Sequence, residues 1–181
     1  MIILPDIPFA EVTIKLHENV WAHKSMFGGP DQIQSRIGGR WTVTVKVPDM
    51  KNDQGRALAT DLAEGITNKV RYRIPSKGNT TTNGTVSSGA GKTLAVVGSN
   101  PKKGDYFSLI HDGKCFLHRV VSNSSGTLLI QPSLKVVPTS GDQVIFESPM
   151  IEGFITTPDQ SYDTDVLEVI FNVTFEISEA Q

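Results

Sequence analysis

YFSLIHDGKCFLHRVV, residues 106–121, carries the strongest hairpin signal in the chain. Asp112-Gly113 separates two apolar runs, and this dipeptide favours a two-residue turn in which both central residues have positive φ. Such a turn predicts two cross-strand pairs, Leu109 with Phe116 and Ile110 with Cys115. Both faces of the hairpin carry apolar side chains, so we expect one face in a core and the other docked on a second surface.

Further short apolar segments surround this hairpin, with turns such as Ser125-Gly126 and Ser140-Gly141 about every ten residues. They are Thr93–Val97, Thr127–Gln131 and Gln143–Glu147. Together with the hairpin they make five strands, which predicts a small β-barrel of the OB or SH3 type. The preceding residues 76–92, SKGNTTTNGTVSSGAGK, have almost no large apolar side chains and are predicted to be a linker or a long exposed loop.

The first seventy residues have a different texture. RWTVTVKV, residues 40–47, alternates apolar and polar side chains and predicts a strand with one buried face, and Glu11–Val20 is a weaker strand of the same kind. Leu58, Leu62 and Ile66 form an apolar stripe that predicts a helix over Asp53–Ile66. Gly65 is well placed to end it in a left-handed conformation. Val70–Ile74 is predicted to be a short strand.

The last strand signal is LEVIFNVTFEI, Leu167–Ile177. Its apolar residues alternate over the whole segment, which predicts one strand of about 36 Å. Its apolar face needs a sheet, and the natural partner is the sheet of the first seventy residues. We therefore predict a mainly β protein with one short α-helix. Residues 1–75 and 151–181 would form one discontinuous β-sandwich-like domain, and residues 76–150 would form an inserted small OB/SH3-like barrel.

Four residues are candidates for contact with another subunit: Met26, Phe27, Arg40 and Trp41. Met26 and Phe27 lie in residues 24–39, whose glycines and Pro30 predict a loop. A loop seldom exposes two large apolar groups, so these side chains either plug the core or pack on a neighbour, and the core is the favoured reading. Arg40 and Trp41 follow at the start of the alternating strand.

Catalytic patterns fail on spacing or setting. Gly91-Lys92-Thr93 would need a glycine at position 86 to make a phosphate loop, and that residue is Val86. Cys115 and His118 lie three apart on a predicted strand, so their side chains should point to opposite faces. His111, beside the turn, should be exposed. We expect no enzymatic activity and no cofactor.

Metal and nucleic-acid sites are also not expected. The acids Asp159, Asp163 and Asp165 lack the glycine and the distant glutamate of a calcium-hand loop. His17 and His23 have no further ligand at a suitable spacing. The net charge is −2, and no basic cluster exceeds two residues. Tyr106 and Arg119 could share one face of the barrel, but two residues make a thin platform for oligosaccharide or single-stranded nucleic acid.

The composition limits the class of protein and the cellular compartment to which the chain can belong. It has 181 residues, of which 38% are hydrophobic and 20% are charged, which is ordinary for a globular chain. The single cysteine cannot form an internal disulfide. The segment MIILPDIPFAEV lacks the cationic start of a signal peptide, and no apolar run could cross a bilayer, so we expect synthesis in a cytoplasm and no membrane partner.

The chain resembles the distal tail proteins of long-tailed, siphovirus-type bacteriophages, of the two-domain kind with an inserted OB-like barrel. The resemblance runs in order along nearly the whole chain. Its parts are SMFGGPDQIQSRIGGRWTVTVKVPDM, the helix ALATDLAEG, GTVSSGAGKTLAVVGSNPKKGDYFSL, TLLIQPSLKVVPTSGDQVIFESP and the final strand. Gly-Gly-Arg-Trp before an alternating strand that ends in proline is similar to the first-domain signature of that family.

This resemblance implies a structural virion protein that forms a homo-hexameric ring at the phage tail tip. Its partners would be the tail tube protein and the baseplate hub, and phage DNA would pass through the lumen without specific binding, as the weakly acidic charge allows. The better-studied members of that family carry a large carbohydrate-binding C-terminal module that these 181 residues do not resemble, so we do not expect direct receptor binding. Two alternatives stay open: a stand-alone OB-like module that binds oligosaccharide or nucleic acid, and another tail part such as a tube or terminator protein.

Overall fold

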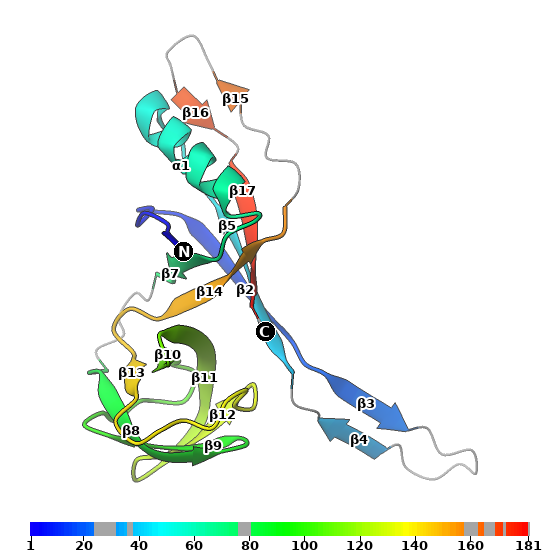
Figure 1. The fold of residues 1–181 in the computed structure, drawn as a ribbon, viewed down its shortest axis with the longest axis vertical. Coiled ribbons are helices and arrows are strands. Elements are labelled where there is room, and N and C mark those ends of the chain that lie inside the picture. Colours follow the sequence, from blue (N-terminus) through cyan, green and yellow to red (C-terminus); the bar gives the residue numbers. More distant parts are fainter. Residues whose placement is uncertain are drawn as a thin grey trace.

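A computed structural model describes residues 1–23, 32–35, 38–75, 81–157, 163–164, 169–171 and 173–180. It confirms the predicted fold class: the described residues form a mainly β protein with one short helix, a separate sheet and a closed β-barrel (Figure 1). The barrel lies at one end of the molecule and the helix at the other, with the sheet between them.

The main sheet has six strands in the order β1-β7-β14-β17-β5-β2. Their bounds are β1 Ile2–Ile3, β7 Val70–Arg73, β14 Met150–Ile155, β17 Thr174–Glu179, β5 Arg40–Lys46 and β2 Glu11–His17. Neighbours run antiparallel except β1 and β7. Because β14 lies between β7 and β17, the two parts of the chain that flank the barrel in sequence share one sheet.

One face of this sheet carries the larger hydrophobic core. Trp41, Val43 and Val45 alternate along β5 and are fully buried, as their spacing predicts. Helix α1, Asn52–Glu64, adds Leu58 and Leu62 to the same cluster. The sequence therefore located the core strand and the helix correctly.

The end of α1 differs from the prediction in two ways. Ile66 is 42% exposed and lies beyond the helix, so it is not part of the buried stripe. Gly65 has φ −66°, a right-handed conformation. Its role is close packing: a Cβ at this position would stand 2.6 Å from Val70 Cγ1 and 2.7 Å from Ile155 Cδ1. The glycine lets the helix end approach the sheet.

The barrel is closed by six strands, in the order β10-β11-β12-β9-β8-β13. They are β8 Gly84–Ala90, β9 Thr93–Val97, β10 Tyr106–His111, β11 Lys114–Ser124, β12 Thr127–Gln131 and β13 Gln143–Ile145. The prediction of five strands, with residues 76–92 as linker or loop, was wrong because β8 lies in that range. Small residues suit this strand, since a Cβ on Gly84 would stand 2.7 Å from the Val97 carbonyl oxygen.

The β10–β11 hairpin has the predicted register. Leu109 pairs with Phe116 and Ile110 with Cys115. Asp112 and Gly113 have φ of 48° and 73°, so both central turn residues adopt the left-handed conformation that the Asp-Gly dipeptide favours. The outer face of the hairpin docks as expected, and the surface it meets is the main sheet of the same chain.

The predicted single strand Leu167–Ile177 is divided in the structure. Val169–Phe171 forms β16, which pairs with β15, Asp163–Thr164, and with β6, Met50–Lys51, in a separate three-stranded sheet. Thr174–Glu179 forms β17 of the main sheet. Alternation marks the exposed and buried faces of a segment but not which neighbour each part pairs with, so the two short strands read as one. Leu167 lies outside the described residues.

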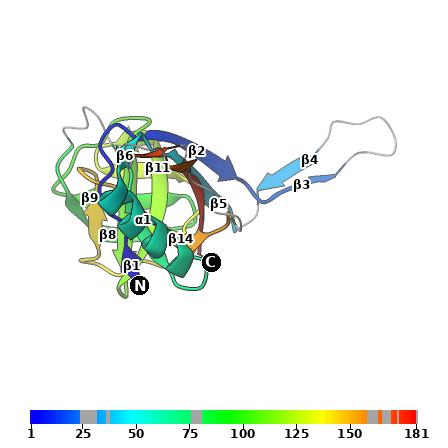
Figure 2. The same ribbon diagram turned by 90° about the horizontal axis from the view of Figure 1, so that it is seen from above.

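A two-stranded hairpin projects from the body of the molecule. It consists of β3, Val20–His23, and β4, Gln32–Ser35. Figures 1 and 2 show it extending away from both the main sheet and the barrel. The prediction of a loop over residues 24–39 was therefore wrong for β4, and the predicted strand Glu11–Val20 divides into β2 and the start of β3.

The described helix is not long and apolar enough to cross a membrane.

The barrel has its own hydrophobic cluster, which includes Phe107, Phe116 and Phe146. Leu117, although it belongs to the barrel strand β11, packs into the cluster of the main sheet. This residue marks the place where the two structures meet.

Candidate functional site: the barrel–sheet interface

Strand β11 has different neighbours along its two halves. Its second half pairs with β12, beginning at Arg119 opposite Gln131. Its first half, up to Leu117, extends past the end of β12 and lies against β14 of the main sheet without pairing with it. Main-chain groups on this outer edge would be unsatisfied if nothing replaced the absent strand.

Four side chains of the main sheet supply those bonds. Glu152 Oε2 accepts from Cys115 N–H at 3.1 Å, and Glu179 Oε1 accepts from Leu117 N–H at 3.1 Å. Trp41 Nε1 donates to the Leu117 carbonyl at 2.8 Å. Arg71 donates to the carbonyl of Gly113 in the hairpin turn. We call these four side chains, Arg71, Glu152, Glu179 and Trp41, the side-chain ladder, because they take the place of a strand beside residues 113–117.

The negative charge of Glu152 is compensated by cations of β7 and the residues before it. Arg71 Nε and Nη2 lie 2.9 and 2.8 Å from Glu152 Oε2, and Lys69 Nζ lies 3.6 Å from Oε1. Glu152 is only 5% exposed. A buried carboxylate needs this density of donors, because removing it from water costs several kcal/mol.

Glu179 is held in the same way from the barrel side. Lys135 Nζ lies 2.8 Å from its Oε2, and the Trp41 main-chain N–H donates to the same oxygen at 3.1 Å. Burial raises the pKa of Glu179, an effect that Lys135 and the two main-chain N–H donors partly offset. The carboxylate therefore joins three segments: β5, β11 and the residues that follow β12.

Trp41 lies at the centre of the interface and is 1% exposed. Its ring meets that of Tyr106 edge to face at 5.5 Å, and the Arg119 guanidinium lies 5.9 Å from the ring centroid. Tyr106 and Arg119 do stand opposite each other on the hairpin. They face the main sheet, however, and so do not form the exposed platform that a ligand of the barrel would use.

The other three candidates for contact with another subunit are Arg40, Met26 and Phe27. Arg40 is exposed at the start of β5. Met26 and Phe27 lie outside the described residues. The structure thus brings only Trp41 into a packed site, and that site is internal; contact of any of the four with another subunit stays a prediction.

Cys115 and His118 lie on different sides of β11, as predicted. Cys115 Sγ donates to the Met150 carbonyl at 3.4 Å, and burial raises the pKa of the thiol to about 11. His118 stacks on Phe107 inside the barrel, and its Nδ1 donates to the Pro132 carbonyl at 3.1 Å. Its Nε2 has no protein partner, and burial lowers the pKa of His118 to about 4. Both groups are uncharged at neutral pH.

The remaining catalytic and metal-site candidates from the sequence form no site in the part of the chain that the structure describes. His111 is half-buried and its Nδ1 lies 2.7 Å from Asp142 Oδ2, so the prediction that it is exposed was wrong. Gly91 and Lys92 form the turn between β8 and β9, which is not the strand-to-helix setting of a phosphate loop. Asp159 and Asp165 lie outside the described residues. Within the described ranges, no group of three His, Cys, Asp or Glu side chains is placed to hold a metal ion.

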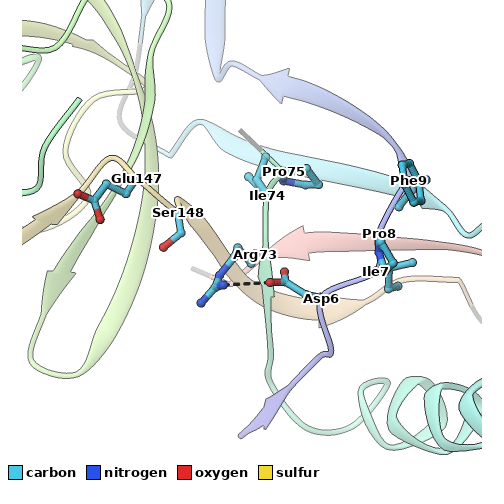
Figure 3. A pocket seen from close by; sticks show the side chains of 10 residues that line it. Asp6, Ile7, Pro8, Phe9, Arg73, Ile74, Pro75, Glu147 and Ser148 are labelled. Atoms are coloured by element: carbon cyan, nitrogen blue, oxygen red, sulfur yellow. Dashed lines mark hydrogen bonds and ion pairs between the residues drawn. The ribbon is translucent and has the colours of Figure 1, made fainter. Parts of the chain in front are cut away.

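A pocket of about 490 Å³ lies where the chain leaves the main sheet for the barrel and where it returns (Figure 3). Its walls come from residues 6–10, from residues 73–75 and from Glu147 and Ser148. Arg73 Nη1 and Asp6 Oδ2 pair across it at 2.9 Å. Phe9 stands at the rim, 90% exposed and with φ 64°. The pocket lies between the two units and brings together no catalytic set.

The two glutamates of the side-chain ladder were not predicted from the sequence. Glu152 interrupts the apolar segment MIEGFI, and Glu179 continues the buried alternation of FEISE. A carboxylate at a position where the pattern requires an apolar side chain is a usable signal for a buried, partnered charge. The position of the partner strand was not readable, because β11 meets these residues only in the folded chain.

The comparisons with known proteins do not add a relative: no protein-family model and no curated protein matches this chain.

Proposed function

We propose that this protein is a structural component of a bacteriophage tail, a ring subunit at its distal end that joins the tail tube to the tip hub. The sequence resemblance described above supports the proposal. So does an architecture in which one sheet, made from residues on both sides of an inserted barrel, carries a projecting hairpin (Figure 1). No enzymatic activity is part of the proposal.

The single observation that carries the proposal is the β3–β4 hairpin. An isolated two-stranded hairpin is at best marginally stable in water. This one extends away from the body in two views at right angles (Figures 1 and 2), so a surface outside the chain is needed to support it. In a ring, each hairpin would reach the neighbouring copy, and a tail tube subunit and a hub would cover the two ring faces.

Size-exclusion chromatography with light scattering, followed by electron microscopy, tests the proposal. We expect a discrete ring of about six copies. A shortened variant, in which residues 20–35 are replaced by an Asn-Gly turn, should remain folded by circular dichroism and lose the ring. If the full-length chain stays monomeric at high concentration and binds glycans or oligonucleotides, the proposal is wrong.

The OB-like binding module is the weaker proposal. Its recognition face would need exposed aromatic and basic residues. Tyr106 and Arg119, the two that the sequence suggested, pack on Trp41. A groove of about 480 Å³ does lie on the barrel between β8 and β13, but its lining, which includes Asn83, Thr85 and Gln143, contains no aromatic or cationic side chain.

A further inference from the structure

The outer edge of the first half of β11 is held by side chains, whereas its inner edge pairs with β10 and its second half pairs with β12 through the main chain. This difference separates two kinds of disruption. Breaking the barrel or the main sheet requires loss of main-chain ladders and of an apolar core. Separating the barrel from the sheet requires only the loss of side-chain contacts, and the main-chain hydrogen bonds within the barrel and within the sheet stay intact.

Many of the contacts across the interface are polar. Apart from the side-chain ladder they include Ser108 Oγ, which bonds the main chain of Met150, and Gln131 Nε2, which donates to Glu18 Oε1 at 2.5 Å. The apolar part consists chiefly of Leu117 and Tyr106 against the cluster around Trp41. Interfaces of this kind between units of one chain permit relative motion unless they are large and hydrophobic.

The buried charges further reduce the net gain from closure. Glu152 and Glu179 are 5% and 4% exposed, and both must be desolvated when the interface closes. Ion pairs with Arg71 and Lys135 offset that cost only in part, as a rule for buried salt bridges. What such pairs do supply is geometry, since each carboxylate oxygen meets particular donors: Glu152 Oε2 accepts from Arg71 and Cys115 N–H, and Glu179 Oε2 from Lys135 and Trp41 N–H.

We propose that the side-chain ladder is a latch, and that the barrel can leave the sheet as a folded unit when these four side chains release residues 113–117. In the closed state the latch sets a single orientation of the barrel. In the open state the first half of β11 is a free strand edge with unpaired N–H groups at Cys115 and Leu117. The device does not depend on ring formation, so its test is separate from that of the proposed function.

Amide hydrogen exchange followed by NMR tests the latch on the unmodified protein. The amides of Cys115 and Leu117 should exchange through an opening that depends less on urea than global unfolding does, because it exposes Trp41, Leu117 and Tyr106 but leaves the rest of both cores buried. Amides of Leu109 in β10 and Val43 in β5 should exchange only by global unfolding. If all four exchange together, with the same dependence on urea, the barrel does not open as a unit and the proposal fails.

Paired variants sharpen the result. Glu152→Gln with Glu179→Gln removes both charges and should raise the exchange rates at positions 115 and 117 about tenfold or more, with those at 109 and 43 changed far less. Glu176→Gln is the matched control, because Glu176 lies on the same strand β17 but bonds Thr44 and Thr156 instead of the barrel. Equal effects of the double variant on all four amides would overturn the latch, and the measurement on the unmodified protein stands if the double variant does not fold.

Discussion

The two halves of β11 differ in how the hydrogen-bonding groups on the outer edge of the strand are satisfied. From Arg119 onward the strand has a neighbour, β12, whose own main chain satisfies it. Up to Leu117 it has instead two carboxylates, an indole and a guanidinium from distant strands. The first solution tolerates most side chains, whereas the second depends on particular ones. The halves should therefore respond very differently to substitution.

The largest effect is expected at Glu179. Glu179→Leu leaves the Leu117 and Trp41 N–H groups and the Lys135 ammonium without their acceptor in a buried place, and should lower the free energy of unfolding by about 3–5 kcal/mol. Urea denaturation measures it. Glu176→Leu on the same strand is the control and should cost about 1 kcal/mol or less, because its partners keep access to water. Equal costs would mean that the ladder adds no more than a surface contact.

The next largest effect is a dependence of the free energy of unfolding on pH that comes from His118, which lies in the interior of the barrel and not at the interface. The folded-state pKa of His118, about 4, lies below its usual 6.5, so the unfolded chain binds a proton first as the pH falls. The resulting stability is fully present above pH 6.5 and decreases toward pH 4 by up to about 3 kcal/mol. His118→Gln should flatten this limb of the stability curve.

Glu179 should show the opposite sign in the same titration. Burial raises its folded-state pKa above the unfolded value, so its contribution is present at low pH and is lost as the pH rises through the folded value. The difference between unmodified protein and Glu179→Gln should therefore slope against that for His118→Gln. Parallel slopes would show that the Lys135 and N–H donors outweigh burial at this carboxylate.

The same comparison explains how far the sequence could predict the fold. The Asp112-Gly113 turn and the alternation of residues 40–47 are local signals, and the strands they predict have the expected register and burial. Residues 84–90 were missed because small residues are suited to a tightly packed barrel strand and also to a loop. Leu167–Ile177 was read as one strand because alternation is blind to a change of partner.

The candidate site was less predictable than the fold for a related reason. Trp41 could be placed on a buried face, but the groups it bonds are Leu117, Tyr106 and Arg119, all far away in sequence. Main-chain pairing repeats along a strand and leaves a pattern. A ladder of four unlike side chains has no period, so only the unexpected carboxylates in MIEGFI and FEISE could have drawn attention to it.

Trp41→Phe is a milder test of the ladder. It keeps most of the apolar bulk and removes the Nε1–H that bonds the Leu117 carbonyl, so we expect a loss of about 1–2 kcal/mol in thermal or urea unfolding. Tyr72→Phe is the counterpart in the same core. The Tyr72 hydroxyl is buried without a partner, and its removal should be neutral or slightly stabilising. A cost for Tyr72→Phe as large as that for Trp41→Phe would assign both effects to packing.

The smallest expected effect concerns the turns at the two ends of β11. Gly113 has φ 73° and Gly126 has φ 87°, so alanine is strained at both and should cost about 1 kcal/mol from backbone conformation alone. A Cβ on Gly113 meets nothing within 4 Å, whereas one on Gly126 would stand 3.1 Å from the Val96 carbonyl oxygen. Gly126→Ala should therefore be the more destabilising in urea unfolding. If Gly113→Ala costs more, the hydrogen bond from Arg71 to the Gly113 carbonyl must depend on the turn geometry, and its loss must outweigh the steric contact at Gly126. The half of β11 that is held by side chains would then be the less tolerant half both at its turn and along its edge.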